Sequence, residues 1–232
     1  MAEGSYKQFC PVAMAAEILC TRWTVVLLRE LLAGSTRFND LRRGVPRMSP
    51  ALLAKRLREL QAAGILERLP VPTEPDVSEY KLTPSGHELR TVVEAVGNWG
   101  QRWVETKPTL ENLDPELLMW DMHRNLNTDP MPHHRSTIQF MYRELPQTSS
   151  NWWLIVEPGK NVDLCSIEPG FDVDLYVSTD LRTMTEIWMG LNTVSRAKRE
   201  DRIILTGSRE LESAMQSWLG LSPFAKIEKL VS

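Results

Sequence analysis

Seven cationic side chains lie between residues 37 and 58, and their spacing suits binding to a polyanion. Asp40 is the single acidic residue in this stretch, so the local net charge is 7 − 1 = +6. Phosphate binding needs such a stripe, because affinity comes from neutralising a row of backbone charges and releasing their counterions. A solvated helical face is the alternative interpretation. The seven residues are Arg37, Arg42, Arg43, Arg47, Lys55, Arg56 and Arg58.

The charge of the whole chain hides this local excess. The 232 residues hold 27 Lys and Arg against 30 Asp and Glu, a net charge of −3. Residues 1–110 hold 15 against 12, whereas residues 111–232 hold 12 against 18. This difference, together with the usual size of domains, predicts two domains, 1–107 and 108–232, joined after Lys107-Pro108.

Other reactive residue types predict little further chemistry. His133 and His134, with Asp129 and His123, fit no usual metal spacing, and two prolines make their segment a loop. The sequence has no glycine-rich phosphate loop, no nucleophile elbow and no evident acid–base pair. We therefore predict no enzyme, no cofactor and no metal site.

The cysteines and the hydropathy pattern predict a cytoplasmic protein with no membrane partner. Cys10, Cys20 and Cys165 are odd in number and match no disulfide or metal spacing, which suits a reducing compartment. No run of about 18 apolar residues and no signal-peptide pattern is present.

Apolar periodicity then predicts the elements that position the basic residues. Helices are expected over 12–20 and 22–33, followed by a short helix that Thr36 caps and Gly44 ends. Ser49 as N-cap and Pro50 at the first helical position open the next helix. Its inward stripe is Leu53, Leu57 and Leu60, and its opposite face carries Pro50, Ala51, Lys55 and Arg58. Small residues followed by basic ones suit a helix that enters a DNA major groove.

After Gly64 the apolar period changes to about two, which predicts strands over 65–69 and 79–82 around a stiff Pro70–Ser78 loop. Thr83-Pro84 caps a long helix that runs to about residue 104. An apolar stripe outside so small a core needs a partner, either the second domain or a two-fold mate. The stripe comprises Leu89, Val92, Val93, Val96, Trp99 and Trp103.

These residues resemble the HxlR-type winged helix-turn-helix regulators over about 95 residues. The resemblance implies a homodimer built largely from the first and last helices, with the Ser49–Ala63 helix in the major groove of double-stranded DNA. The wing departs from the family pattern, because Glu74 to Tyr80 carries acidic residues where an Arg is common. The matching motifs are Cys10-Pro11-Val12, Arg22-Trp23-Thr24, Leu28-Arg29-Glu30-Leu31, Arg37 to Leu41, Ser49-Pro50, Arg56 to Leu60, Gly64, Glu79-Tyr80 and Leu82 to Gly86.

Residue type and position suggest a role for each basic side chain. Lys55 and Arg58 are expected to reach guanine edges or phosphates. Arg56 has a competing role, since it can pair with Glu59 or Glu30. Ser49 is an N-cap first and a phosphate contact second. The residues expected to contact phosphates without reading sequence are Arg37, Arg42, Arg43 and Arg47.

Cys10 is a candidate redox site, because a cysteine at the matching place senses oxidants or electrophiles in some members of the family. The alternative is a small buried hydrophobe near the dimer interface.

The second half predicts an α+β domain in which an antiparallel sheet has helices on one side. The expected elements are a helix over 115–124, strands over 136–144, 152–157, 161–167, 171–178 and 203–205, and helices that Asp180 and Ser208 cap. This order, with Arg202 to Gly207 leading into the last helix, resembles a sterol-carrier-protein-type (SCP2-like) domain.

That resemblance implies a cavity for an apolar small molecule. Ordinary core packing is the alternative for each candidate residue. The predicted ligand-binding residues are Phe140, Trp152, Trp153, Met184, Trp188, Met189, Met215 and Trp218.

Three functions are therefore open. The first is a homodimeric, DNA-binding transcription regulator that responds to an apolar effector in its second domain. The second is a thiol switch through Cys10, and the third is a lipid carrier with little DNA binding.

Overall fold

A computed structural model describes residues 5–105 and 112–231, apart from the side chains of Pro75 and Asp76. The chain divides into two compact units, Met1–Gly97 and Asn98–Ser232, each with its own hydrophobic core. The predicted boundary after Lys107 lies outside the described residues and stays a prediction.

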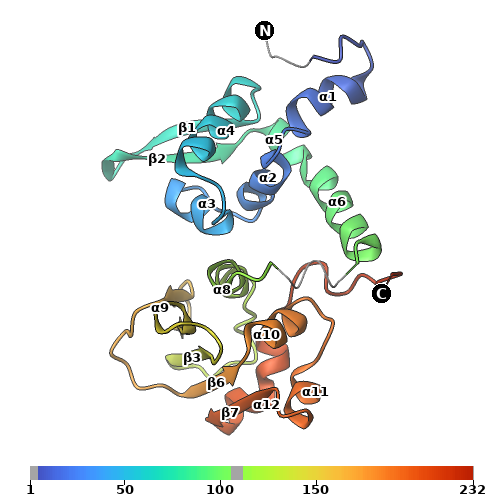
Figure 1. The fold of residues 1–232 in the computed structure, drawn as a ribbon. Helices are drawn as coiled ribbons and strands as arrows, with labels where there is room; N and C mark the ends of the chain where they lie inside the picture. The colour runs from blue at the N-terminus through green and yellow to red at the C-terminus, as the bar shows by residue number, and fades with distance from the viewer. Residues whose placement is uncertain (1–4, 106–111, 232) are drawn as a thin grey trace. The chain divides into compact units, whose positions relative to one another are not determined.

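The first unit is a set of short helices followed by a hairpin (Figure 1). Its core consists largely of leucines that lie at helical spacing in the sequence. Among them, Leu27, Leu41, Leu53 and Leu57 are almost fully buried. The elements in order are α1 (Pro11–Leu19), α2 (Thr24–Leu32), α3 (Phe38–Gly44), α4 (Pro50–Ala62), β1 (Leu66–Val71), β2 (Glu74–Leu82) and α5 (Pro84–Glu88). The next helix, α6 (Arg90–Trp103), begins in the first unit and ends in the second.

The hairpin is longer than predicted, and the expected loop from Pro70 to Ser78 is wrong. The two strands pair up to residues 71 and 74, with a register shift between Pro70 and Val71. A two-stranded sheet consists of edge strands, so a proline without an N–H is tolerated there.

The short helix α3 does not use its predicted cap. The backbone of Thr36 instead accepts a hydrogen bond from the Tyr80 amide at 2.8 Å, and Arg37 forms an antiparallel bridge with Glu79. Arg37 therefore occupies the N-cap position, and its side chain makes no capping bond. Pairing with β2 outcompetes the local cap.

The helix predicted from Thr83 to about residue 104 is interrupted at Leu89. Thr83 Oγ1 accepts from the Gly86 amide at 3.3 Å and donates to the Gly64 carbonyl at 2.7 Å. A Cβ atom on Gly86 would lie 2.2 Å from the carbonyl oxygen of Ile65. This close approach fixes α5 against the start of the hairpin, and α6 follows as a separate helix.

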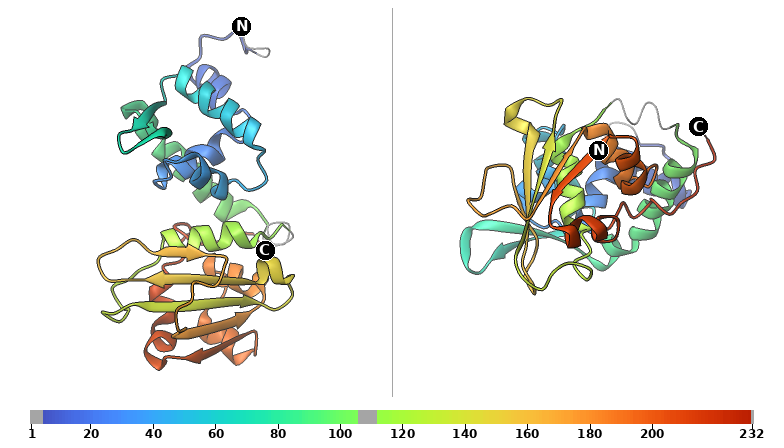
Figure 2. Two further views of the ribbon diagram at one scale, coloured as in Figure 1. Left: turned by 90° about the vertical axis from the view of Figure 1, so that its left-hand side faces the viewer. Right: turned by 90° about the horizontal axis from the view of Figure 1, so that it is seen from below.

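The second unit contains one five-stranded sheet in the order β5–β4–β3–β6–β7. Its helices α8, α10, α11 and α12 contribute side chains to one core against the sheet (Figure 2). The short helices α9 and α11 were not predicted from the sequence. The elements are α8 (Pro115–Arg124), β3 (Ser136–Tyr142), α9 (Gln147–Ser150), β4 (Asn151–Val156), β5 (Asp163–Cys165), β6 (Leu175–Thr179), α10 (Leu181–Trp188), α11 (Val194–Arg199), β7 (Ile203–Gly207) and α12 (Arg209–Trp218).

This sheet is mixed, which corrects the prediction of an antiparallel sheet. Strands β3 and β6 run parallel, whereas the other neighbouring pairs are antiparallel. After the β4–β5 hairpin, the chain returns through residues 166–174 to the other side of β3. There the Asp174 amide donates to the Thr137 carbonyl at 2.9 Å, and Asp174 Oδ2 accepts from the Thr137 amide at 2.8 Å. These bonds start β6 in the same direction as β3.

Candidate nucleic-acid interface

Helix α4 begins where the sequence predicts and presents basic residues outward. Ser49 Oγ accepts a hydrogen bond from the Leu52 amide at 3.3 Å, and Pro50 takes the first helical position. The leucines at 53, 57 and 60 are buried in the core. Because residues three or four apart share a face of a helix, the other face points to solvent. Its exposed residues include Pro50, Ala51, Lys55 and Arg58.

A partly buried ion pair positions α3 against α2, and it was not predicted from the sequence. Glu30 is completely buried, and its Oε1 accepts from Arg29 Nη2 at 2.7 Å. The same Arg29 nitrogen donates to the carbonyl of Gly44, the last residue of α3, at 2.9 Å. A Cβ atom on Gly44 would lie 1.8 Å from Glu30 Oε2. The adjacent Arg29-Glu30 pair inside an apolar helix was the available signal.

The predicted phosphate contacts differ in how freely they can meet DNA. Arg42 on α3 and Arg58 on α4 are exposed, and neither pairs with an acidic side chain in the described part of the chain. Arg43 Nη1 lies 3.7 Å from Asp40, and Lys55 Nζ lies 3.9 Å from Glu59. Arg47 is exposed in the turn that precedes α4. The geometry thus favours Arg42 and Arg58 as ligands of a polyanion.

The side chain of Arg37 is paired with a carboxylate of the same chain. Its Nη2 lies 2.5 Å from Glu74 Oε1, and its Nη1 donates to Glu74 Oε2 at 3.2 Å. This bidentate hydrogen bond to Glu74 raises the pKa of Arg37 above its ordinary value. A phosphate at Arg37 would have to compete with this carboxylate.

Arg56 mainly supports the fold, in agreement with its predicted competing role. Its guanidinium pairs with Glu59, and its Nε donates to the Arg22 carbonyl at 3.2 Å. The side chain is 13% exposed, so little of it is available to a ligand. Of the two partners that the sequence suggested, Glu59 is the one observed, since Glu30 pairs with Arg29.

The hairpin presents mixed charge rather than a basic wing. Glu74 faces Arg37, and Glu79 Oε2 lies 3.0 Å from Lys81 Nζ. The side chain of Asp76, part of the predicted acidic tip, lies outside the described residues. Whether this hairpin contacts a minor groove stays a prediction.

The helices at the two ends of the winged-helix segment expose apolar side chains. On and before α1, Phe9 is 98% exposed and Val12 is 76% exposed. Along α6, Val93 is buried whereas Val96 and Trp99 are 51% and 62% exposed, and Trp103 is similar. Exposed apolar faces of this kind usually mark an interface with another chain.

The Cys10 thiol lies at the N-terminus of α1 and is partly exposed. The nearby backbone amides of Ala13 and Val12 lower the pKa of this thiol below the ordinary value for cysteine. In the second unit, burial raises the pKa of the Cys165 thiol, and the nearby Asp163 raises it further. The pKa of Cys10 is therefore lowered and that of Cys165 is raised, which makes Cys10 the more reactive of these two thiols near neutral pH.

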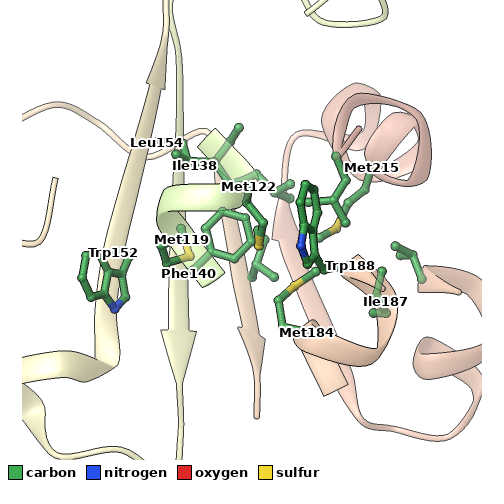
Figure 3. Packing of buried hydrophobic residues seen from close by; sticks show 14 of the residues in the cluster. Met119, Met122, Ile138, Phe140, Trp152, Leu154, Met184, Ile187, Trp188 and Met215 are labelled. Atoms are coloured by element: carbon green, nitrogen blue, oxygen red, sulfur yellow. The ribbon is translucent and has the colours of Figure 1, made fainter. Parts of the chain in front are cut away.

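Most of the predicted ligand-binding residues meet in one packed core (Figure 3). Phe140, Met184, Met215 and Trp218 are completely buried there, and Met189 packs at its edge. Trp152 and Trp188 belong to the same cluster. Trp153 lies on the opposite face of β4, because side chains alternate along a strand. It therefore cannot share a pocket with the others.

Two of the cavities in the described part of the chain lie elsewhere. A cleft of about 680 Å³ lies between the N-terminal segment, α1 and α4, where Tyr6, Glu17, Cys20, Lys55 and Arg56 help to line it. A second, of about 410 Å³, lies between α11 and α12. Neither cavity includes a predicted ligand-binding residue of the second unit.

Residues 5–105 and 112–231 contain neither a cluster of metal-ligating side chains nor a single helix that could span a membrane. Among them, the His, Cys, Asp and Glu side chains form no group of three that could hold a metal ion. No single helix in this part of the chain is both long enough and apolar enough to cross a bilayer, and α1 with α2 reaches that length only as a pair bent by 82°.

The helices α3 and α4, the turn between them and the following hairpin define a winged helix-turn-helix protein. The family model described as HxlR-like helix-turn-helix matches residues 18–108. The HTH-type transcriptional regulator YvaP of Bacillus subtilis is 32% identical over 99 residues, which cover 42% of this chain and 92% of that protein. Rv3095 of Mycobacterium tuberculosis is 36% identical over 144 residues, covering 55% and 89%. The chain belongs to the HxlR-like family of DNA-binding transcription regulators.

Solved structures of two regulators are also similar in sequence. The redox regulator HypR in its reduced form is 31% identical, and the match covers 44% of this chain and 98% of HypR with a TM-score of 0.38. The reduced transcriptional regulator YodB of B. subtilis is 31% identical, covering 43% and 98% with a TM-score of 0.38.

Proposed function

We propose that this chain regulates transcription as a homodimer that inserts α4 of each subunit into the major groove of double-stranded DNA. The observation that carries the proposal is the outward face of α4, where Arg58 is unpaired among the described residues and Lys55 is held weakly. Arg42 extends the same charge onto α3. The N-cap at Ser49 fixes the start of α4, and the Arg29–Glu30 pair fixes α3 against α2.

The exposed apolar faces of α1 and α6 support the dimer. Leaving apolar surface in water costs about 25 cal/mol per Å² relative to burying it, so such faces favour association. A two-fold dimer would also present two recognition helices to successive half-sites of an operator.

DNA titrations test the role of α4. The probe is a duplex taken from upstream of the protein's own gene, with binding followed by fluorescence anisotropy at several salt concentrations. If Arg58 contacts a phosphate, Arg58→Ala should weaken binding to all duplexes and reduce the salt slope by about 1. If it reads a base, the loss should be about 1–3 kcal/mol and confined to the specific site. The control is Arg209→Ala, which removes an exposed arginine from α12. Unchanged binding by Arg58→Ala at every salt concentration would remove Arg58 from the interface.

We further propose that the second unit is SCP2-like and receives an apolar effector. Its Met- and Trp-rich core supports this proposal, because such side chains rearrange readily around a guest. An effector must displace part of this packing, and it regulates DNA binding only by favouring one of two states of the dimer. Native mass spectrometry of the purified full chain tests for a copurified apolar molecule. A bound mass should appear, and releasing it should change the affinity for DNA.

A thiol switch at Cys10 is a second candidate, favoured by the lowered pKa and partial exposure of that thiol. Hydrogen peroxide should then change the affinity of the protein for DNA, and Cys10→Ser should abolish this response without altering binding under reducing conditions. An equal response in the variant would exclude Cys10 as the sensor.

A further inference from the structure

The C-terminal segment, Ser222–Val231, is anchored to the second unit at the end of α10. The Ser222 amide donates to the carbonyl of Trp188, the last residue of α10, at 2.9 Å. Gly190 has a φ of +75°, and a Cβ atom there would lie 2.8 Å from the Ala225 carbonyl oxygen. The segment is therefore in close contact with the turn that follows α10.

The other end of the same segment binds the C-terminus of α6. Lys229 Nζ donates to the Val104 carbonyl at 2.7 Å, and it lies 3.5 Å from the Gln101 carbonyl oxygen. The Leu230 amide donates to the Arg102 carbonyl at 2.9 Å. The tail thus supplies donors to three carbonyl groups at or just beyond the last turn of this helix.

A helix leaves its last four carbonyl groups without intrahelical partners, and a cation near them also interacts favourably with the helix dipole. Many helices solve this with a glycine just past the end, but α6 continues into Val104-Glu105. Its C-terminal cap comes instead from Lys229 and Leu230, more than one hundred residues later in the sequence.

The capped turn carries part of the exposed apolar stripe. Trp103 is the last residue of α6, and Trp99 lies one turn earlier. Fraying of this turn would release both indole side chains from their helical positions. The tail contact therefore lies at a part of the helix that the proposed dimer needs.

We propose that the segment Ser222–Val231 is a latch between α10 and α6. Through this segment, the packing of α10 in the second unit controls whether the last turn of α6 is ordered. The order of that turn in turn controls dimerisation. The inference rests on the proposed homodimer. A change in the core around Trp188 shifts the anchor at Ser222, loosens Lys229 and Leu230 from α6, and lets the turn that carries Trp103 fray.

The first test compares two matched lysine substitutions in the 232-residue chain. Lys229→Met removes the capping ammonium group, whereas Lys226→Met removes an exposed lysine three residues away in the same tail. Amide hydrogen exchange of the peptide covering residues 99–105 should become about 2- to 5-fold faster in Lys229→Met, the effect expected for loss of a helix-end charge. Lys226→Met should leave the exchange unchanged. Equal exchange in both variants and the parent would overturn the latch.

The second test addresses the relay, which is the effect that a change at the end of α10 has on the last turn of α6. Gly190→Ala places a methyl group against the Ala225 carbonyl at a residue with positive φ. It should accelerate exchange of the same 99–105 peptide, although residue 190 is remote from α6 in sequence. A thermal scan confirms that the second unit remains folded. If the unit is folded and the exchange is unchanged, the relay is wrong.

Sedimentation velocity on the same variants separates this proposal from the function on which it rests. If the latch and the dimer are both correct, Lys229→Met raises the dimer dissociation constant by about 2- to 5-fold. If the parent chain is a monomer throughout, the proposed homodimer fails. Exchange of residues 99–105 still decides whether the tail caps α6.

Discussion

Helix α1 of the first unit leaves its apolar side chains unburied, whereas helix α10 of the second unit buries most of its own. In α1 none of the nine residues is buried, whereas α10 buries five of its eight, including Met184 and Trp188. Both helices are rich in apolar residues, so composition does not explain the difference. The apolar side chains of α10 pack in one core with the sheet of the same unit. A helix like α1 needs a surface that the first unit does not provide.

The strongest test of this contrast is Trp218→Ala in the second unit. Trp218 is completely buried, and its Nε1 donates to the Leu211 carbonyl at 2.7 Å. Removing the indole should cost about 3–5 kcal/mol of unfolding free energy, because a cavity forms and an acceptor loses its donor. Urea unfolding followed by circular dichroism measures this loss. A cost below about 1 kcal/mol would show that the core is less tightly packed than described.

Gly44→Ala probes the tightest contact of the first unit. The added methyl group would overlap the Glu30 carboxylate and force α3 away from α2, which should cost about 1–3 kcal/mol. DNA affinity should fall as well, because α3 carries Arg42, one of the proposed DNA contacts. Gly100→Ala is the control, since a Cβ atom there meets open space in α6. Unfolding and DNA titration of both variants should separate them clearly.

Trp99→Ala tests whether a second copy of the chain covers the exposed apolar faces of α1 and α6. The indole is 62% exposed, so the stability of the individual subunit should change little. If Trp99 is a central contact of the dimer, the dissociation constant should rise by about 30-fold, or about 2 kcal/mol. Sedimentation equilibrium measures this constant. An unchanged constant would place the interface elsewhere.

The cysteines give the smallest and most local test. Cys10 has a lowered pKa and Cys165 a raised one, so Cys10 should form its reactive thiolate at a lower pH. Iodoacetamide labelling followed by peptide mass spectrometry should show faster modification of Cys10 near pH 7. Raising the pH should narrow the difference as Cys165 also ionises. Similar rates for both thiols across the pH range would contradict the assigned environments.

Local signals in the sequence predict local structure well. Ser49, Asp180 and Ser208 each accept a hydrogen bond from the amide three residues later, as N-caps do. These caps depend on a few neighbouring residues, so a short window contains the necessary information. The inward leucines of α4 were predicted for the same reason.

Contacts between distant segments escaped the sequence analysis. Thr36 resembles a cap, but its backbone pairs with β2 instead. The parallel pairing of β3 with β6 depends on how residues 166–174 return across the sheet, and apolar alternation is the same for either strand direction. The burial of Glu30 was not predicted, because it depends on the pairing with Arg29 and on the absence of a side chain at Gly44, which lies in another helix.

The candidate site was predictable in part. Residue types located the basic stretch 37–58, but they gave no means of ranking its members. The ranking comes from acidic partners: Glu74 engages Arg37 and Glu59 engages Arg56, whereas Arg58 remains unpaired among the described residues. Glu74 is 37 residues away from Arg37, so this pairing required the hairpin to be placed.

The Arg37–Glu74 pair has a consequence for the ionic-strength dependence of DNA binding. A phosphate that binds a free arginine displaces mobile ions, and their release into solution favours binding. At Arg37 the anion to be displaced is a carboxylate on β2, which cannot diffuse away. Glu74 is in effect a tethered counterion, so a phosphate at Arg37 gains less from dilution of the salt than one at Arg42. If α4 binds DNA as proposed, this tethered charge disfavours every DNA sequence alike and leaves a larger share of the affinity to α4.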